Sequence, residues 1–269
     1  MLELGTLLGG TQASKGANKM EIDTRKTVKE IVLEMPGSED VFERLGIDYC
    51  CGGDKRLEDA CQAAGRPVGE VLQLLEAAKN TVPAEAGASD WSQQSLASLV
   101  NHIVEKHHTF CRQELARLEL LLAKVSEVHG ANHPELRRIQ TIFSGMSKEL
   151  QMHLIKEEQT LFPYIARMED AVTRGMPFPR PPFGTVQNPV RMMVLEHDNA
   201  GAALHEMRKL SGDHQVPEDG CSSYKALYEG LRSFESDMHQ HVHLENNILF
   251  PRALALEDTA AAAEKRAAN

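Results

Sequence analysis

Most of the chain beyond residue 90 carries apolar residues at every third or fourth position, the period of an α-helix with one buried face. The predicted long helices cover about 91–128, the stretch from Pro134 to Met168, a third around Val190–Leu204 and a fourth around Leu227–Ile248. The connections at 129–133 and 211–220 are short, and the proline-containing stretch 174–189 is a crossing loop. An up-down-up-down four-helix bundle over 91–256 is therefore expected.

Residues 21–83 show shorter apolar patterns, which are typical of a small helical module. Its candidate helices are 28–35, 39–45, 57–64 and 68–79. Ser38 stands where a capping residue of the second helix is expected, and the following loop contains Cys50-Cys51-Gly52-Gly53. Segment 1–20 is expected to be a disordered extension or to precede a start at Met20, and the Ala-rich segment 257–269 to be a disordered tail. The predicted fold class is all-α.

Charge and cysteine usage exclude several classes of function. The formal net charge is −10, with 29 basic against 39 acidic residues, so a nucleic-acid partner is not expected. No apolar run approaches the roughly 20 residues that span a bilayer, so a membrane segment is not expected either. Five cysteines that include an adjacent pair do not form a secreted disulfide framework. Reduced thiols and a cytoplasmic location are therefore predicted.

One signature occurs twice at identical spacing. A histidine is followed four residues later by a glutamate and then by Leu-Phe-Pro, at His153 with Glu157 and at His241 with Glu245. A further histidine precedes each copy at almost the same distance along the chain, so a helical hairpin is present twice. Positions four apart lie on one helix face, so each pair points at a shared spot. The residues of this pattern expected to face the bundle interior are His108, His153, Glu157, His197, His241 and Glu245.

These imidazoles and carboxylates predict a metal site. A buried carboxylate without a partner costs several kcal/mol, so something must compensate its charge. A single histidine in a core is more often a hydrogen-bonded structural residue, but six matched positions outweigh that alternative. Nitrogen and oxygen ligands without thiolates favour iron or manganese over structural zinc. The inventory suits two iron ions with a solvent-derived oxo or hydroxo bridge, and it leaves a position open for small molecules.

The remaining histidines carry weaker signals. Those near the predicted ligands, expected beside the site or in solvent, are His107, His239 and His243. Those without a spacing argument, expected at the surface, are His102, His205 and His214. Cys111 lies one turn after His108, and a small apolar core residue is favoured over a ligand there. His129 lies too far along the first helix to serve the same site.

The adjacent cysteines admit two interpretations. Cys50 and Cys51 cannot form a tetrahedral metal site alone, while Gly52 and Gly53 give the loop freedom for close approach to another molecule. Reactive or transfer thiols are one interpretation, and a turn that happens to contain two cysteines is the other. The residues alone leave both open.

The Cys-Cys-Gly-Gly loop and the paired motifs together resemble the repair of iron centres (RIC) family, di-iron proteins of bacteria that restore damaged iron–sulfur clusters. The resemblance extends from about 24 to 256, includes Lys156-Glu157-Glu158 and Glu196-His197-Asp198, and implies a hemerythrin-like bundle. It implies that the four histidines of the pattern are terminal ligands and that Glu157 and Glu245 bridge the irons. Oxygen-carrying hemerythrins have a second histidine one turn after the residue equivalent to His197, where this chain has Gly201, which disfavours oxygen storage.

The resemblance also implies a function. The expected activity is repair of clusters damaged by nitric oxide or oxidative stress through donation of iron, with Cys50 and Cys51 as functional thiols that contact the recipient or control redox state. The alternatives are a sink for nitric oxide, a reductase that couples two nitric oxide molecules, and a purely structural bundle. The expected partners are nitric oxide or another small gas and damaged iron–sulfur proteins, and a homodimer is left open.

Overall fold

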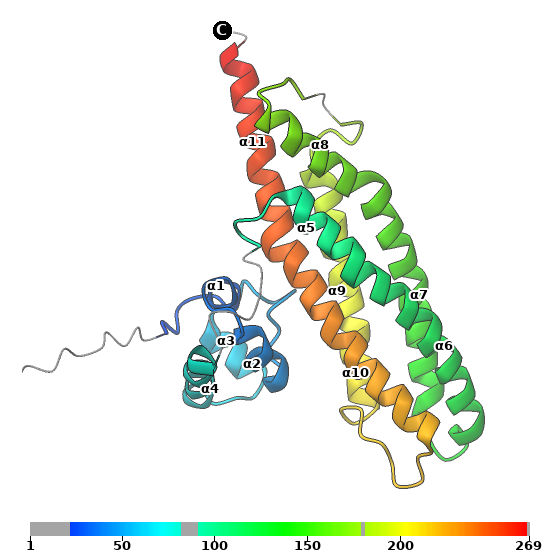
Figure 1. Cartoon of the computed structure of the whole chain (residues 1–269). Helices are drawn as coiled ribbons and strands as arrows, with labels where there is room; N and C mark the ends of the chain where they lie inside the picture. The colour runs from blue at the N-terminus through cyan, green and yellow to red at the C-terminus, as the bar shows by residue number, and fades with distance from the viewer. Residues whose placement is uncertain (1–21, 82–90, 179–180, 268–269) are drawn as a thin grey trace, which may run out of the picture.

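The computed structural model describes residues 22–81, 91–178 and 181–267 (Figure 1). The predicted all-α class is confirmed, since the described residues form helices and loops and only an isolated β-bridge between Thr27 and Arg56. None of these helices is long and apolar enough to cross a membrane. The extension expected at 1–20 lies outside the described residues.

The first long hairpin consists of two helices that each contain a π-helical turn. Its first helix is continuous through α5 (Leu96–His102), η1 (Ile103–His108) and α6 (Thr109–His129). It begins at 96 rather than 91, because the Ser95 side chain accepts from Ser98 N and caps the first turn. Its second helix comprises α7 (Glu135–Lys156), η2 (Glu157–Leu161) and α8 (Phe162–Thr173).

The second hairpin has the same order of two long helices, but only its second helix contains a π-helical turn. Its helices are α9 (Gln187–Leu210) and a long helix made of α10 (Ser222–His243), η3 (Leu244–Leu249) and α11 (Phe250–Ala267). The disordered tail expected at 257–269 is wrong as far as Ala267, because the alanines that looked like a frayed end are strong helix formers and continue α11. Residues 268–269 lie outside the described part.

The π-helical turns η2 and η3 have a cause in the sequence. Pro163 and Pro251 follow them, and proline has no backbone N–H to donate to the residue four positions earlier. The unpaired carbonyls fall inside η2 and η3, where the wider turn changes the bonding pattern. The repeated Leu-Phe-Pro therefore sets the backbone next to both glutamates of the signature.

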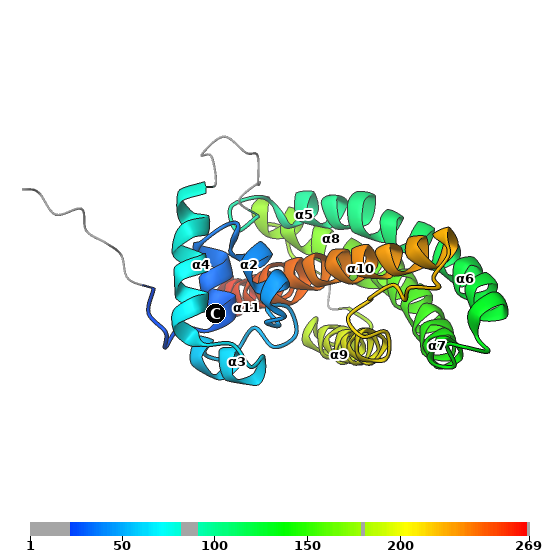
Figure 2. The same cartoon turned by 90° about the horizontal axis from the view of Figure 1, so that it is seen from below.

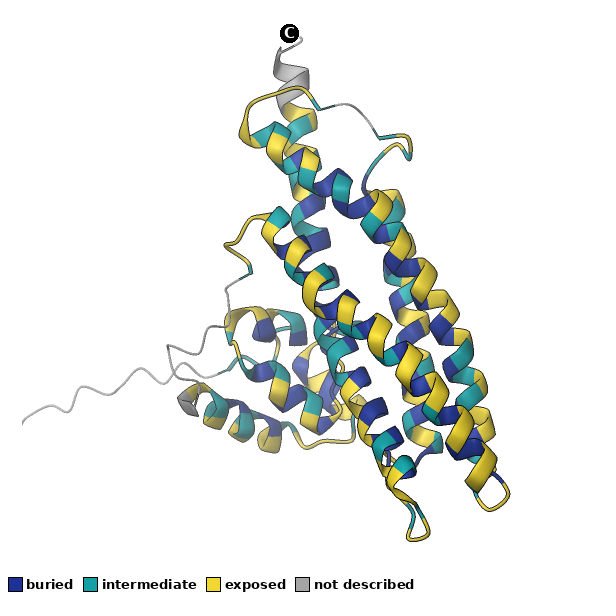
Figure 3. Cartoon of the chain, turned by 45° about the vertical axis from the view of Figure 1, so that its right-hand side comes forward, coloured by how far each residue is buried: buried dark blue, intermediate teal, exposed yellow. Residues whose placement is uncertain are grey.

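The bundle has three closely packed sides and one loose side. Close contacts join α6 to α10, α6 to α7 and α7 to α9, so the side between α9 and α10 is the loosest. Buried positions lie on the faces that the helices turn toward one another (Figure 3). They form two separate apolar clusters, one around Phe143 and Phe234 and another around Phe162 and Phe250. The polar residues of the signature lie in the layer between these clusters.

The N-terminal module has a core of its own. Its helices are α1 (Val28–Glu34), α2 (Ser38–Leu45), α3 (Leu57–Ala63) and α4 (Val68–Thr81). Thr27 and Glu30 form a capping box at the start of α1. Ser38 does not cap α2 as expected. Gly37 takes the N-cap with φ 91°, a left-handed conformation that glycine adopts without strain, and Ser38 is buried inside the first turn.

The module is attached to the loose side of the bundle. Helix α2 lies beside α10 in both views (Figures 1 and 2). His239 of α10 donates from Nδ1 to Glu43 of α2 at 2.7 Å, and Asn247 donates to the carbonyl of Tyr49 at 3.0 Å. Cys50 belongs to the apolar cluster of the bundle rather than to the core of the module. The cysteine loop is therefore held against the bundle by both polar and apolar contacts.

Candidate metal centre

The structure brings the six predicted ligands together in the polar layer of the bundle. Each lies on a different turn of the four long helices, and each is at most 2% exposed. They form two overlapping groups, His108, Glu157, His241 and Glu245, and His153, Glu157, His197 and Glu245. Within each group, one ligand atom from every residue lies within 4.8 Å of the others. Both carboxylates belong to both groups, as expected of groups shared between two ions.

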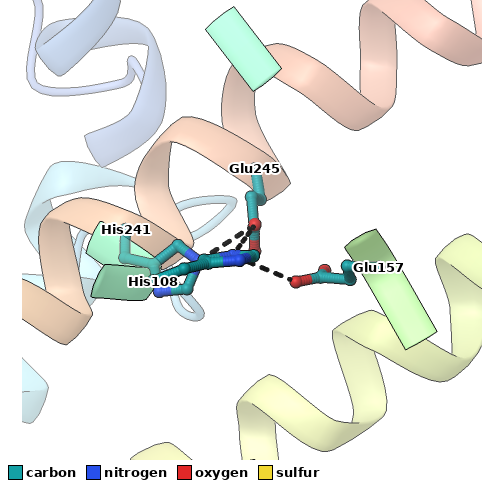
Figure 4. A group of neighbouring side chains, drawn as sticks. All are labelled: His108, Glu157, His241 and Glu245. Atoms are coloured by element: carbon teal, nitrogen blue, oxygen red, sulfur yellow. Dashed lines mark hydrogen bonds and ion pairs between the residues drawn. The ribbon is translucent and has the colours of Figure 1, made fainter. Parts of the chain in front are cut away.

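The first group is seen in Figure 4, where His108, His241 and Glu245 face Glu157 from across the bundle. His241 Nε2 lies 3.0 Å from Glu245 Oε1, and His108 Nε2 lies 3.4 Å from Glu157 Oε2. The two Nε2 atoms of the group are 3.1 Å apart. Every imidazole of this group therefore turns its Nε2 toward one small volume.

The second group repeats the geometry. His153 Nε2 lies 3.3 Å from Glu157 Oε2, and His197 Nε2 lies 3.1 Å from Glu245 Oε2. The two Nε2 atoms are again 3.1 Å apart. The close agreement between the groups follows from the duplicated hairpin, which presents the same residue types from corresponding turns.

Three carboxylate oxygens in the centre indicate that a cation belongs there. Both oxygens of Glu157 and Oε2 of Glu245 are buried without a well-aligned hydrogen bond, and the groups that lie against them are imidazole nitrogens at 3.1–3.4 Å. An ionised carboxylate in such a place is costly unless a cation satisfies it. Four inward-facing imidazole nitrogens and two carboxylates supply the donor set that iron or manganese prefers. The residues present therefore fit a metal site.

Two of the histidines that face the carboxylates, His108 and His153, are protonated in the metal-free protein. Burial alone would lower their pKa, but hydrogen bonds and charge attraction from Glu157 and Glu245 outweigh it. The pKa of His108 is raised to about 10 and that of His153 to about 9. Burial alone would raise the pKa of both carboxyl groups. The facing imidazoles outweigh burial, so the pKa of each lies below its ordinary value, most strongly for Glu245. Two imidazolium groups thus balance two carboxylates.

Polar residues outside the centre orient three of the ligand imidazoles. His108 donates from Nδ1 to Glu158 at 2.7 Å, and His153 donates from Nδ1 to Glu196 at 2.8 Å. His197 donates from Nδ1 to Asn246 at 2.9 Å. Such partners fix the ring so that Nε2 faces the metal. Sequence reasoning missed these roles, although each partner directly follows or precedes a predicted ligand along the chain.

Two histidines outside the centre are more buried than a surface position would be. His214, expected at the surface, is 4% exposed because Ser211 and Glu235 hold it under the end of α9. His107, expected either beside the site or in solvent, is 1% exposed and stacks on the imidazole of His241. His205 is exposed as expected. Cys111 is fully buried in the apolar cluster, the interpretation favoured from the sequence.

The cysteine loop has a defined local structure. Asp48 accepts from the backbone N–H groups of Cys50 and Cys51 at 3.1 and 2.9 Å, which tightens the turn. Gly52 is required because an added Cβ would lie 2.9 Å from the Asp48 carboxylate. Gly53 is required because an added Cβ would lie 2.8 Å from the carbonyl oxygen of Tyr49. The two glycines therefore serve close packing.

The thiols face the metal centre across α9. The Sγ of Cys51 lies 3.7 Å from the place that a Cβ on Gly201 would occupy. A cavity of about 360 Å³ opens here, and Cys50, Cys51, Gly201 and the ligand His197 line it. A hydrogen bond with the Cys51 thiol and burial raise the pKa of the Cys50 thiol well above its usual range, so this group stays protonated. The missing histidine at Gly201 thus makes room for the thiol loop.

Comparison with known proteins agrees with this architecture. Residues 99–253 match the hemerythrin HHE cation binding domain, and residues 24–79 match a domain of unknown function, DUF542. A probable iron–sulfur cluster repair protein of Haemophilus influenzae is 34% identical over 86% of this chain and 97% of its own length. The iron–sulfur cluster repair protein YtfE of Yersinia pseudotuberculosis is 33% identical over 83% of this chain and 94% of its own length. The resemblance expected from the motifs is confirmed, and the chain belongs to the family of iron–sulfur cluster repair proteins.

Proposed function

We propose that this protein repairs iron–sulfur clusters by donating iron from a pair of ions held in the bundle. The observation that carries the proposal is the sharing of both buried carboxylates by two ligand groups. His108 and His241 would hold one ion, His153 and His197 the other, and Glu157 and Glu245 would bridge them. A solvent-derived oxo or hydroxo group would complete the bridge. The ions supply ferrous iron as the transferred cargo.

The protonation of the centre supports release of the cargo. When iron leaves, His108 and His153 can take up protons, because both have pKa values well above neutrality in the metal-free protein. These charges would balance the charges of Glu157 and Glu245 in the emptied centre. A site that is stable both full and empty can give up metal without unfolding. This property distinguishes a donor from a structural metal site.

The thiol loop supplies the second element of the proposal. Cys50 and Cys51 would contact the recipient protein or control redox state, next to the cavity that reaches His197. The sulfur atoms are 3.9 Å apart, so both thiols are free in the structure. Free thiols suit a reducing compartment, and we place the protein in the cytoplasm, acting after nitrosative or oxidative damage.

Nitric oxide chemistry at the same centre is the alternative function. The cavity beside His197 gives a small gas access to the open side of the centre. As a sink, the protein would form a stable complex with nitric oxide and keep its iron. As a reductase, it would yield nitrous oxide beyond one equivalent per centre under anaerobic turnover. Gas analysis and iron counting on the same sample separate these two activities from donation.

Transfer of labelled iron tests the donor function. The full chain is loaded anaerobically with ⁵⁷Fe(II), mixed with an apo iron–sulfur protein plus sulfide, and separated from it. Label in the rebuilt cluster supports donation, and label that stays in the bundle contradicts it. A chain carrying both E157Q and E245Q is the control, because it keeps the fold-forming apolar clusters but lacks the shared carboxylates. Free ⁵⁷Fe(II) with a chelator sets the background.

A further inference from the structure

The duplicated hairpin allows the surroundings of the two ions to be compared residue by residue. The first half of the centre contains His108 and His241, and the second half contains His153 and His197. In the repeat, His108 corresponds to His197, and His153 corresponds to His241. Each half therefore takes one imidazole from each type of helix, and any difference between them comes from neighbouring residues.

The halves differ in how their imidazoles are supported. Both rings of the second half have acceptors for Nδ1, supplied by Glu196 and Asn246. In the first half, Glu158 supports His108. The Nδ1 of His241 is fully buried and has no hydrogen-bond partner.

His107 is the residue responsible for this difference. The repeat places it where Glu196 stands in the other hairpin, since each directly precedes a ligand histidine. Glu196 accepts from His153, whereas His107 stacks on His241 with 5.7 Å between ring centroids and 11° between planes. The Nδ1 of His107 is bonded to Asp237 at 3.0 Å. An imidazole in place of a carboxylate leaves His241 without an acceptor.

Missing support weakens a metal ligand in two ways. A ring bound through Nε2 carries its proton on Nδ1, and a buried donor without an acceptor is unfavourable because it has lost its hydrogen bond to water. An acceptor on Nδ1 also fixes the ring and makes Nε2 more basic, and its removal typically lowers metal affinity about 10–100-fold. Both effects act on His241 and on neither ring of the second half.

Access to solvent does not reverse this order. The second half borders the thiol cavity through His197. Another cavity, of about 450 Å³, is lined by His107, which stacks on His241 of the first half, together with His102 and His243. A cavity therefore lies close to each half, and ligand support is the property on which the order is argued.

We propose that the iron held by His108 and His241 leaves first, and that His107 sets this order as a positioning residue. The inference rests on the proposed donor function and names which half of the centre supplies the cargo. In the release step, the Fe–N bond to His241 and the remaining bonds of that ion break, the ferrous ion passes to the acceptor, and His108 regains a proton from solvent. No electron is transferred.

A matched pair of variants assigns the release phases to the halves. Glu158 supports His108 and also pairs with Arg112, while Glu196 supports His153 and also pairs with Lys156. The two carboxylates are therefore equivalent except for the half they serve. The diferrous protein is mixed anaerobically with an excess of a ferrous chelator, and release is followed by absorbance. Two phases of one iron each are expected. E158Q accelerates only the fast phase, by about tenfold, and E196Q accelerates only the slow phase.

H107Q tests the role of the positioning residue. The glutamine amide can accept from His241 Nδ1 and donate to Asp237, which restores the missing bond without adding a charge. The fast phase is expected to slow by about tenfold, with the slow phase unchanged. A merely structural substitution would leave both phases alone or accelerate both. H107F, which keeps a stacked ring but has no acceptor, is the control and is expected to retain the fast phase.

Several outcomes overturn the inference. Loss of both irons in one phase means that the halves are equivalent. Acceleration of the slow phase by E158Q means that the order is reversed. An unchanged fast phase in H107Q removes the role of His107, and if H107Q does not fold, the E158Q and E196Q pair still decides the order. Two-phase release to a chelator without transfer to a cluster protein contradicts the proposed function alone.

Discussion

Loading the bundle with iron should release protons, because metal and protons compete for the same imidazoles. The pKa of His108 is raised to about 10 and that of His153 to about 9, so both are protonated at neutral pH. Glu157 and Glu245 have lowered pKa values and are already ionised, so they release none. Two ferrous ions should therefore displace about two protons per chain from these imidazoles at about pH 7.5, and a hydroxo bridge formed from water would release about one more.

The magnitude follows from the linkage between protonation and binding. Each proton displaced makes binding about tenfold tighter per pH unit, or about 1.4 kcal/mol. Between about pH 6.5 and 8.5, two protons raise the product of the two binding constants by about 10⁴-fold, or about 5 kcal/mol. The dependence flattens above the range of the two folded-state pKa values, about 9 to 10.

Anaerobic titration calorimetry in buffers of different ionisation enthalpy measures the proton count. The variant H133Q is the control, because His133 also has a raised pKa, caused by its bond to Asp219, but lies outside the centre. It should release the same number of protons as the parent protein. Binding that releases no protons, or an affinity that does not change over this pH range, would refute the assignment of protonated imidazoles at the centre.

Three further outcomes are expected. The metal-free protein should lose stability as pH rises from about 6.5, the ordinary imidazole pKa, to about 9 to 10, the raised folded-state values, while the loaded protein should not; thermal unfolding across pH checks this. G201A should be stabilised by up to about 1 kcal/mol, since its methyl group meets Cys51 at an ordinary 3.7 Å, whereas G201L should displace the loop and speed alkylation of Cys51. Cys221, exposed and with its pKa lowered to about 7 mainly by His129, should be alkylated first, and the buried Cys50, Cys61 and Cys111 last, as peptide mass spectrometry would show.

The sequence was sufficient for the bundle and for the composition of the centre. Helical periodicity located the long helices, and the duplicated spacing selected His108 and its repeat partner His197, although each is the only predicted ligand on its helix. Local periodicity cannot reveal a bond between different helices. Glu158 and Glu196 are therefore part of the sequence motifs, but the motifs do not predict their hydrogen bonds to the histidine rings.

The remaining differences have local physical causes. Nothing in the cysteine loop predicts that Cys51 lies over Gly201, because that contact depends on how the module is held by Glu43 and His239. His214 has no periodic signal, since it is buried by a turn rather than by a helix face. The C-terminal alanines carry no apolar stripe that would predict a packed helix, whereas their intrinsic propensity is enough to extend an existing helix.

Mössbauer spectroscopy tests the central claim most directly, because it reports the pair of ions and its loss together. The full chain is loaded with ⁵⁷Fe(II), and spectra are recorded before and after an unlabelled apo iron–sulfur protein and sulfide are added. The account predicts two irons per chain in nitrogen and oxygen coordination, whose signal decreases as that of a labelled cluster grows. Iron that does not bind in the bundle, or a pair whose spectrum is unchanged while the cluster stays unlabelled, would contradict it.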